Sequence, residues 1–387
     1  MVKPGYKQTE IGVIPEDWTV ANFGSKAKIF RGGSPRPIQD YLTQADDGVN
    51  WIKIGDVREG DKYITSTEEK IIPEGVSRSR TVHVGDFILS NSMSFGRPYI
   101  LNIDGCIHDG WLTIQEYEQT FSKDFLYYLL SSDSVYQQYI SMAAGSSVKN
   151  LNKEKVSALV VAYPDIGEQK KIAEALSCID SIIAYSEKEI AKKKAINQGA
   201  MQELLTGKKR LPGFSGEWET IPLKKALTVG HGMSQHDVEC PSGKYPILAT
   251  GGVIGRASKY LCDMPSVLIG RKGTINKPQY MDKPFWSIDT LFYTKINEGY
   301  CPKFLYYVFC RIDWLSYNEA SGVPSLSART IENIEVKIPQ YTEQLAIAEL
   351  LAEIDSEIEA LEQKLSKYRQ VKHGMMQQLL TGKIRLV

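Results

Sequence analysis

An internal repeat constrains the fold of this 387-residue chain more than any other feature of its sequence. Residues 164–211 align without a gap onto residues 339–386, and 23 of these 48 positions are identical. The identical pieces include Glu-Gln, Ile-Ala-Glu and Ile-Asp-Ser near the start and Leu-Leu-Thr-Gly-Lys near the end. Such self-similarity indicates that one structural plan occurs twice. We therefore expect two halves, each closing with a matched segment.

Each matched segment is predicted to form one long helix, because apolar residues recur at steps of four and three, the heptad pattern of helices that pack together. In the second segment these positions are Ile347, Leu351, Ile354, Ile358, Leu361, Leu365 and Tyr368. The first segment is less regular, with Ser186 and Lys193 at two of the positions. A proline precedes each segment, and Thr-Gly-Lys at 206–208 and 381–383 supplies a glycine stop. Each helix should span about 38 residues, or about 57 Å.

A heptad pattern by itself can mean no more than a structural coiled coil. Here both helices belong to one chain and each follows a globular half, so we expect them to pair with each other in antiparallel fashion. The two halves would then lie at opposite ends of a rod, related by approximate twofold symmetry.

The sequence upstream of each helix is predicted to form an α+β domain. Short runs of β-branched and aromatic residues predict strands, and longer apolar patterns predict helices. The expected strands are at residues 49–55, 86–89, 98–101, 266–269 and 291–293, and the expected helices at 125–140 and 303–317. The fold class is therefore α+β, with two globular domains joined by two long antiparallel coiled-coil helices in a pseudo-twofold repeat.

Loops rich in glycine, small polar residues and arginine separate these strands. They lie at residues 31–35, 90–97, 145–150, 250–256, 270–276 and 322–325. Arginine can hold guanine with two hydrogen bonds and asparagine can hold adenine, while hydroxyl groups and exposed backbone amides suit phosphate. Each loop taken alone is more simply explained as an ordinary turn-rich surface. Together they make DNA a candidate ligand.

Several chemistries are excluded. The net charge is zero, so no overall basic excess marks a nucleic-acid partner. The six cysteines form no C-x-x-C pair, His231 and His236 lack a third metal ligand, and the glycines at 251–255 are too closely spaced for a dinucleotide fingerprint. We find no catalytic motif and no apolar run of about 18 residues. The expected protein is soluble and intracellular, with no metal of its own.

The paired segments resemble a known family at this point. Two variable halves, each closing with Pro, Glu-Gln, Ile-Ala-Glu, Ile-Asp and Leu-Leu-Thr-Gly-Lys, are similar to the specificity subunit of type I restriction-modification systems. The opening residues 5–18, the run 84–89 and, in the second half, residues 270–274 and 287–290 are also typical of that family. The resemblance covers essentially the whole chain.

The resemblance implies that each half is a target-recognition domain reading one part of a split DNA site. The implied domains are residues 1–165 and 208–340 for recognition, with spacer helices at 166–207 and 341–387. We expect DNA contacts from Asn91, Ser94, Arg97 and Lys149 in the first half, and from Arg256, Arg271, Lys272, Thr274 and Asn276 in the second.

The implied partners are double-stranded DNA, two methyltransferase subunits and restriction subunits, in the cytoplasm. The resemblance also implies that the subunit itself is not an enzyme and carries no cofactor, because S-adenosylmethionine, ATP and magnesium would be held by those partners. Two alternatives stay open: a DNA-recognition partner in a methylation-only or phage-defence system, and a coiled-coil scaffold that binds protein alone.

Overall fold

The chain folds into two compact units. The computed structural model describes residues 2–58, 60–91, 95–143 and 150–387. Unit 1 consists of Met1–Tyr185 and Leu365–Val387, and unit 2 of Ser186–Lys364. Each unit thus contains one globular domain and parts of both long helices. The domain boundaries expected from the sequence lie at the ends of the long helices, whereas the two units divide within these helices. The expected boundaries therefore remain a prediction.

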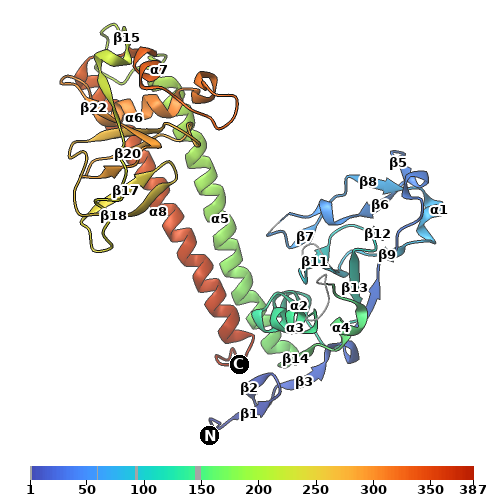
Figure 1. Cartoon of the computed structure of the whole chain (residues 1–387). Helices are drawn as coiled ribbons and strands as arrows, with labels where there is room; N and C mark the ends of the chain where they lie inside the picture. Colours follow the sequence, from blue (N-terminus) through green and yellow to red (C-terminus); the bar gives the residue numbers. More distant parts are fainter. Residues whose placement is uncertain (1, 59, 92–94, 144–149) are drawn as a thin grey trace. The chain divides into compact units, whose positions relative to one another are not determined.

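The two matched segments form the long helices α5 (Ile166–Leu204) and α8 (Tyr341–Leu379), shown in green and in orange to red in Figure 1. Each is 39 residues long, as the repeat predicts. The predicted glycine stops are present as well. Gly207 and Gly382 have φ angles of 69° and 68°, the left-handed conformation that ends a helix without cost at glycine.

Within each unit the two helix parts run antiparallel. In unit 1, Lys372 Nζ on α8 lies 2.6 Å from Asp180 Oδ1 on α5. In unit 2, Asn197 Nδ2 on α5 donates to Asp355 Oδ1 on α8 at 2.7 Å, and Lys193, one turn earlier, pairs with Glu357. In unit 2 the later residue of α5, Asn197, thus contacts an earlier residue of α8 than Lys193 does, as expected for antiparallel helices. The heptad positions that are buried include Ile172, Leu176, Ile179, Ser186, Ile190, Ile347, Leu351, Ile358 and Leu365.

The globular domain of unit 1 contains two five-stranded sheets. The first has the order β4 (Lys28–Arg31), β13 (Trp111–Gln115), β10 (Phe87–Ser90), β11 (Pro98–Leu101) and β7 (Tyr63–Ile64). The second has the order β5 (Leu42–Thr43), β8 (Glu69–Ile71), β6 (Val49–Ile52), β12 (Gly105–Ile107) and β9 (Arg80–Val82). Smaller pairs are β1 (Tyr6–Thr9) with β2 (Gly12–Pro15) and β3 (Thr19–Asn22) with β14 (Val160–Tyr163). The short helices are α1 (Pro73–Val76), α2 (Lys123–Leu130), α3 (Asp133–Ala143) and α4 (Lys153–Ser157).

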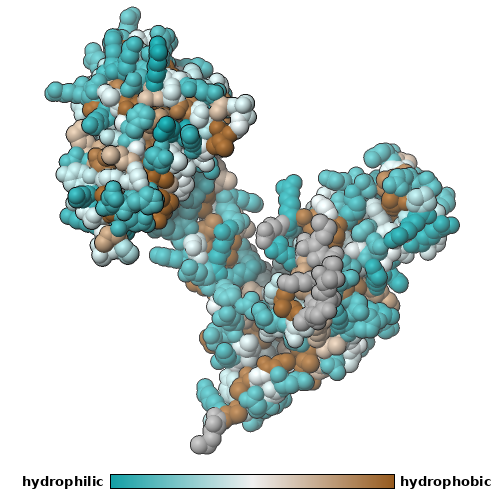
Figure 2. Space-filling view, in the orientation of Figure 1, coloured by the Kyte–Doolittle hydropathy of each residue, from teal (hydrophilic) through white to brown (hydrophobic). Residues whose placement is uncertain are grey.

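Unit 2 repeats this plan with fewer strands. Its main sheet has the order β16 (Leu227–His231), β22 (Leu291–Ile296), β19 (Ser266–Gly270) and β20 (Gln279–Met281). A smaller sheet has the order β18 (Gly252–Ala257), β17 (Tyr245–Ala249) and β21 (Trp286–Ser287), and β15 (Glu219–Pro222) pairs with β23 (Glu335–Ile338). The helices are α6 (Pro302–Arg311) and α7 (Ala328–Asn333). The visible surface of this unit is largely hydrophilic with scattered apolar residues (Figure 2).

Two predicted helices are shorter than the sequence suggested. The helix expected at 125–140 is broken between α2 and α3 at Ser131 and Ser132, where the Ser132 hydroxyl accepts from the Val135 amide at 3.4 Å and starts a new helix. The helix expected at 303–317 ends at Arg311, because Ile312 takes an extended conformation. A 3-10 turn, Trp314–Tyr317, follows. The prediction of single helices there was wrong.

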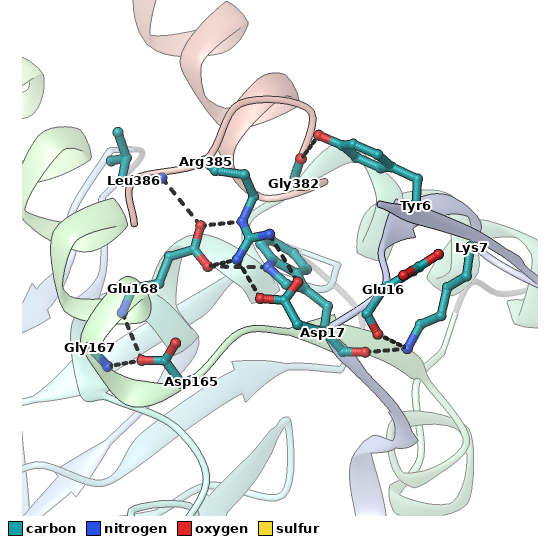
Figure 3. A network of polar contacts seen from close by, with 11 residues as sticks. Tyr6, Lys7, Glu16, Asp17, Asp165, Gly167, Glu168, Gly382, Arg385 and Leu386 are labelled. Atoms are coloured by element: carbon teal, nitrogen blue, oxygen red, sulfur yellow. Dashed lines mark hydrogen bonds and ion pairs between the residues drawn. The ribbon is translucent and has the colours of Figure 1, made fainter. Parts of the chain in front are cut away.

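The end of the chain completes unit 1 (Figure 3). Arg385 donates to both oxygens of Glu168 at 2.7 and 2.8 Å and to both oxygens of Asp17 at 2.9 and 2.7 Å. Glu168 is only 3% exposed, and it also accepts from Trp18 Nε1 at 3.3 Å. The hydrogen bond from Arg385 lowers the pKa of Asp17. A buried carboxylate at the start of α5 is thus neutralised by the segment that follows α8.

Unit 2 is closed by the same residues one repeat earlier. Arg210, which follows α5, donates to both oxygens of Glu343 at the start of α8 at 2.6 and 2.7 Å. Its second contact differs, because Arg210 Nη1 donates to the carbonyl oxygen of Gly216 at 2.8 Å where Arg385 uses a carboxylate. In each unit, the arginine that follows one long helix therefore pairs with the buried glutamate at the start of the other long helix.

Candidate nucleic-acid interface

Three connections meet at one end of the main sheet of unit 2, and a fourth packs beside them. We call residues 232–234, 271–276, 288–290 and 322–325 the second loop cluster. Met233 N donates to Ser287 O at 2.8 Å, Arg271 N to Thr290 O at 2.8 Å, and Gly273 N to Pro324 O at 2.8 Å. These backbone bonds hold four separate stretches of chain at fixed positions. The loops predicted at 270–276 and 322–325 are therefore brought together.

Unit 1 builds the same arrangement, which we call the first loop cluster (residues 32–34, 91 and 108–110). Gly33 N donates to Ile107 O at 3.1 Å and Asn91 N to Gly110 O at 3.1 Å. Leu151 N donates to Asn91 O at 2.8 Å, just as Leu326 N donates to Arg271 O at 3.0 Å. These matching bonds make Asn91 and Arg271 structural equivalents. Different residue types thus occupy one position of a common backbone framework.

The side chains of this equivalent pair are also held alike. Asn91 Nδ2 donates to the carbonyl oxygen of Asp109 at 3.0 Å, and Arg271 Nη1 donates to the carbonyl oxygen of Asp289 at 3.4 Å. Asn91 is 5% exposed, so its amide is engaged inside the protein. Arg271 is half-buried and keeps further guanidinium N–H groups for another partner.

Asp109 organises the first loop cluster. Its carboxylate accepts from Ser34 Oγ at 2.9 Å and lies 3.3 Å from Arg36 Nη2 and 2.9 Å from His108 Nε2. Partial burial acts to raise the pKa of Asp109, but the Ser34 hydrogen bond and the neighbouring His108 and Arg36 side chains outweigh it and lower the pKa. A carboxylate held in this way is a fixed part of the loop framework.

The remaining predicted contact residues lie in several places. Lys272 and Asn276 are exposed and Thr274 is half-buried, all in the second loop cluster. Arg97 directly precedes β11 and lies across from Ser90 at the loop end of the β10–β11 hairpin, and it lines a hollow of about 790 Å³ with Tyr127 and Tyr136. Arg256 lies on β18, away from the cluster, and donates to Lys244 O at 3.2 Å. Ser94 and Lys149 lie outside the described residues.

Sequence reasoning missed the cationic and acidic partners of these loops. Arg31 Nε donates to the Asp109 carbonyl at 3.4 Å, beside the Asn91 amide, and Arg36 pairs with the Asp109 carboxylate. The Arg-Gly-Gly-Ser stretch directly after a strand was a usable signal for Arg31. Asp289 lies in the family-typical run 287–290 but was not chosen as a contact residue, and no sequence signal separated Asp109 from the other aspartates of the chain.

One glycine of each cluster is required by close backbone packing. A Cβ atom on Gly232 would lie 1.8 Å from the carbonyl oxygen of Ile288 and 2.8 Å from that of Leu291. Gly32 is in the same situation, 2.1 Å from the carbonyl oxygen of His108. Both contacts are with backbone, which cannot turn aside as a side chain can. The tight approach of these loops therefore depends on glycine.

We predict that Gly232→Ala destabilises unit 2 by about 1–3 kcal/mol, because the loop must move away from residues 288–291. The free energy of unfolding in urea measures this. Gly251→Ala is the matched control, since its Cβ would meet no atom within 4 Å. Equal stability of the two variants would contradict the close packing of the cluster.

Other kinds of site find no support in the described residues. Histidine, cysteine, aspartate and glutamate side chains do not gather there in groups of three that could hold a metal ion. The helices of the same ranges lack the long apolar stretch needed to cross a membrane.

These features define the class of protein. The chain is duplicated, and its two units share one backbone framework for the loop cluster but carry different side chains on it. A family model described as "Type I restriction modification DNA specificity domain" matches residues 15–195 and 215–367. The chain belongs to this family.

Similar proteins agree with this assignment. The type I restriction enzyme MjaVIII specificity subunit of Methanocaldococcus jannaschii is 23% identical, over 96% of this chain and 94% of its own length. The EcoprrI specificity subunit of Escherichia coli is 20% identical, over 81% of each chain. The crystal structure of the type I restriction-modification S subunit from M. genitalium covers 94% of this chain and 96% of its own, with a TM-score of 0.63 at 14% identity. The α+β fold with two repeated domains is thereby confirmed.

Proposed function

We propose that this chain is the DNA specificity subunit of a type I restriction-modification complex, and that each unit reads one half of a split DNA target. The observation that carries the proposal is the duplicated loop cluster. One backbone framework presents Asn91 in unit 1 and Arg271 in unit 2 at equivalent positions. A duplicated framework with different side chains suits a protein that reads two unlike half-sites.

The second loop cluster has the chemistry that base and phosphate recognition needs. Arg271 has free N–H groups that match the two acceptors of guanine, O6 and N7. Lys272 is an exposed cation beside it, and exposed Asn276 can donate and accept at once. Phosphate contacts fix the position of a protein on DNA, and base contacts give specificity.

The zero net charge of the chain bears on its partners. Phosphate contacts supply much of the affinity of proteins for DNA, and they need cations. We propose that methyltransferase subunits, two per complex, supply much of this charge and hold S-adenosylmethionine. Restriction subunits would hold ATP and magnesium. The specificity subunit is then a non-catalytic component, working in the cytoplasm where the DNA is.

Methylome sequencing of a host that expresses this chain with its methyltransferase partner tests the proposal. The expected result is one methylated motif with two specified parts separated by an unspecified gap. A host that shows no new methylated motif, although the complex assembles, would contradict the proposal and favour a protein-binding scaffold.

Replacement of Arg271 should affect only the half-site that unit 2 reads. We predict that Arg271→Ala lowers discrimination at one base pair there by about 1–3 kcal/mol, the usual contribution of a paired arginine contact to guanine. Competition binding with duplexes that differ at single positions measures this. Arg311→Ala, at the end of α6 in the same unit and outside the second loop cluster, is the matched control and should leave discrimination at both half-sites unchanged. Equal losses at both half-sites would show that Arg271 acts on phosphate alone.

A further inference from the structure

Asp289 and Asp109 occupy equivalent positions in the two loop clusters. The carbonyl oxygen of Asp289 accepts a hydrogen bond from the Arg271 side chain, and that of Asp109 accepts one from the Asn91 side chain. The residue after each aspartate, Thr290 or Gly110, accepts from the backbone amide of that same partner. The two aspartates are therefore fixed by the same set of contacts.

The carboxylates of these two aspartates have different surroundings. Asp109 is held by Ser34, Arg36 and His108, which leaves its side chain 28% exposed. Asp289 is exposed, and within the described ranges no hydrogen bond or ion pair reaches its carboxylate.

The sequence of unit 2 explains this difference. The residue equivalent to His108 is Ile288, which cannot donate, and Arg36 corresponds to His236. Ser234, the counterpart of Ser34, instead accepts from the His236 backbone amide at 3.4 Å. All three partners of Asp109 are thus missing at Asp289. The carboxylate of Asp289 is free to meet a ligand.

An exposed carboxylate in a DNA-facing loop repels phosphate, so it contributes to binding only where DNA offers a donor. In the major groove those donors are the exocyclic amino groups of cytosine and adenine. Arg271 donates to the Asp289 carbonyl oxygen, and the Lys272 amide donates to the carbonyl oxygen of the next residue, Thr290, at 3.3 Å. Asp289 thus lies beside two cations, of which Lys272 can hold the DNA backbone nearby. A carboxylate there would add an acceptor to the donors of Arg271.

We infer that Asp289 is a specificity-determining residue of unit 2, which accepts a hydrogen bond from the amino group of a cytosine or adenine in the major groove. Asp109 has a different role and only positions the first loop cluster. The inference rests on the proposed function and deepens it, because it assigns one side chain to one kind of base group.

The test uses the complex of the full chain with its methyltransferase partner and duplexes altered at one base at a time. At each cytosine or adenine of the second half-site, the amino group is removed by 2-pyrimidinone or purine substitution. The wild-type complex should lose affinity on the order of tenfold or more at one position. The Asp289→Ala complex should be indifferent to the amino group at that same position.

Two further results separate base reading from a structural role. Asp289→Ala should bind non-specific DNA as well as or better than wild type, because a negative charge is removed from the interface. Discrimination at the first half-site should not change. Asp282→Ala removes the same charge from an exposed site just after β20, beyond the strand end opposite the loop cluster, and should leave discrimination at both half-sites as in wild type.

The inference is overturned if amino-group removal costs the Asp289→Ala complex as much as wild type at every position. It is also overturned if Asp289→Ala loses discrimination equally at every position of the second half-site, because such a result indicates that the loops have lost their structure. In either case a wild-type complex that still methylates a split motif leaves the proposed function standing. A wild-type complex that reads no split motif would refute the proposed function itself.

Discussion

Arg385→Ala is expected to destabilise unit 1 by about 3–5 kcal/mol, the usual cost of leaving one member of a buried ion pair without its partner. Glu168 is 3% exposed and receives two hydrogen bonds from Arg385. Without the guanidinium, its charge would remain buried, and among the described residues Trp18 Nε1 and the Leu386 amide would be the donors left to it. Urea unfolding, followed by hydrogen exchange of the β3 and β14 amides, measures the loss.

Arg210→Ala provides the matched comparison, because it removes the equivalent pair with Glu343 from unit 2. Each variant should loosen its own unit and leave the exchange of the other unit unchanged. Arg385→Lys should recover only part of the stability, since lysine keeps the charge but not the two parallel hydrogen bonds. A change in unit 2 on replacing Arg385 would refute this division of the chain.

Insertion of seven residues into both long helices is expected to lengthen the unread gap of the DNA target by about three base pairs. The inserts would follow Lys188 in α5 and Gln363 in α8, positions that are equivalent in the repeat. Seven residues restore the heptad pattern and add about 10.5 Å of helix, close to three base pairs at about 3.4 Å each. The bases specified in each half-site should not change.

Methylome sequencing reports the gap directly, and circular dichroism shows whether the helices persist. An insert in α5 alone is the control, because it puts the two helices out of register and should abolish methylation rather than lengthen the gap. An unchanged gap with both inserts present and both helices intact would mean that the helices do not set the spacing.

The sequence predicted the long helices well because their information is local and occurs twice. Ile347 and Leu351 recur at helical spacing, and Gly207 and Gly382 stop both helices where the repeat indicates. The break between α2 and α3 was missed because the apolar pattern continues through it. Its cause is a single serine hydroxyl that caps a new helix, a signal weaker than the pattern around it.

The loop clusters were only partly predictable. Asn91 and Arg271 were both expected as DNA contacts, from their residue types and loop positions within the implied recognition domains, but their equivalence depends on backbone bonds between distant segments. The offset between the halves changes along the chain, from 200 residues at Gly32 and Gly232 to 180 at Asn91 and Arg271. No alignment of the two halves with one fixed offset therefore reveals that Asn91 and Arg271 are equivalent. The run 287–290 was noticed as typical of the family, but a role for the Asp289 side chain could not be predicted, because it depends on the hydrogen-bond partners that Asp109 has and Asp289 lacks.

The closure of unit 1 by the segment after α8 has a consequence for synthesis on the ribosome. Unit 2 ends at Lys364, whereas unit 1 needs Leu379, Leu380 and Arg385, which are made later. Domains usually fold in the order in which they emerge, but here the domain translated first can finish folding only after the second. During that interval the core around Ile172 and Leu176 lacks Leu379 and Leu380, so nascent unit 1 exposes apolar surface until the end of α8 has been made.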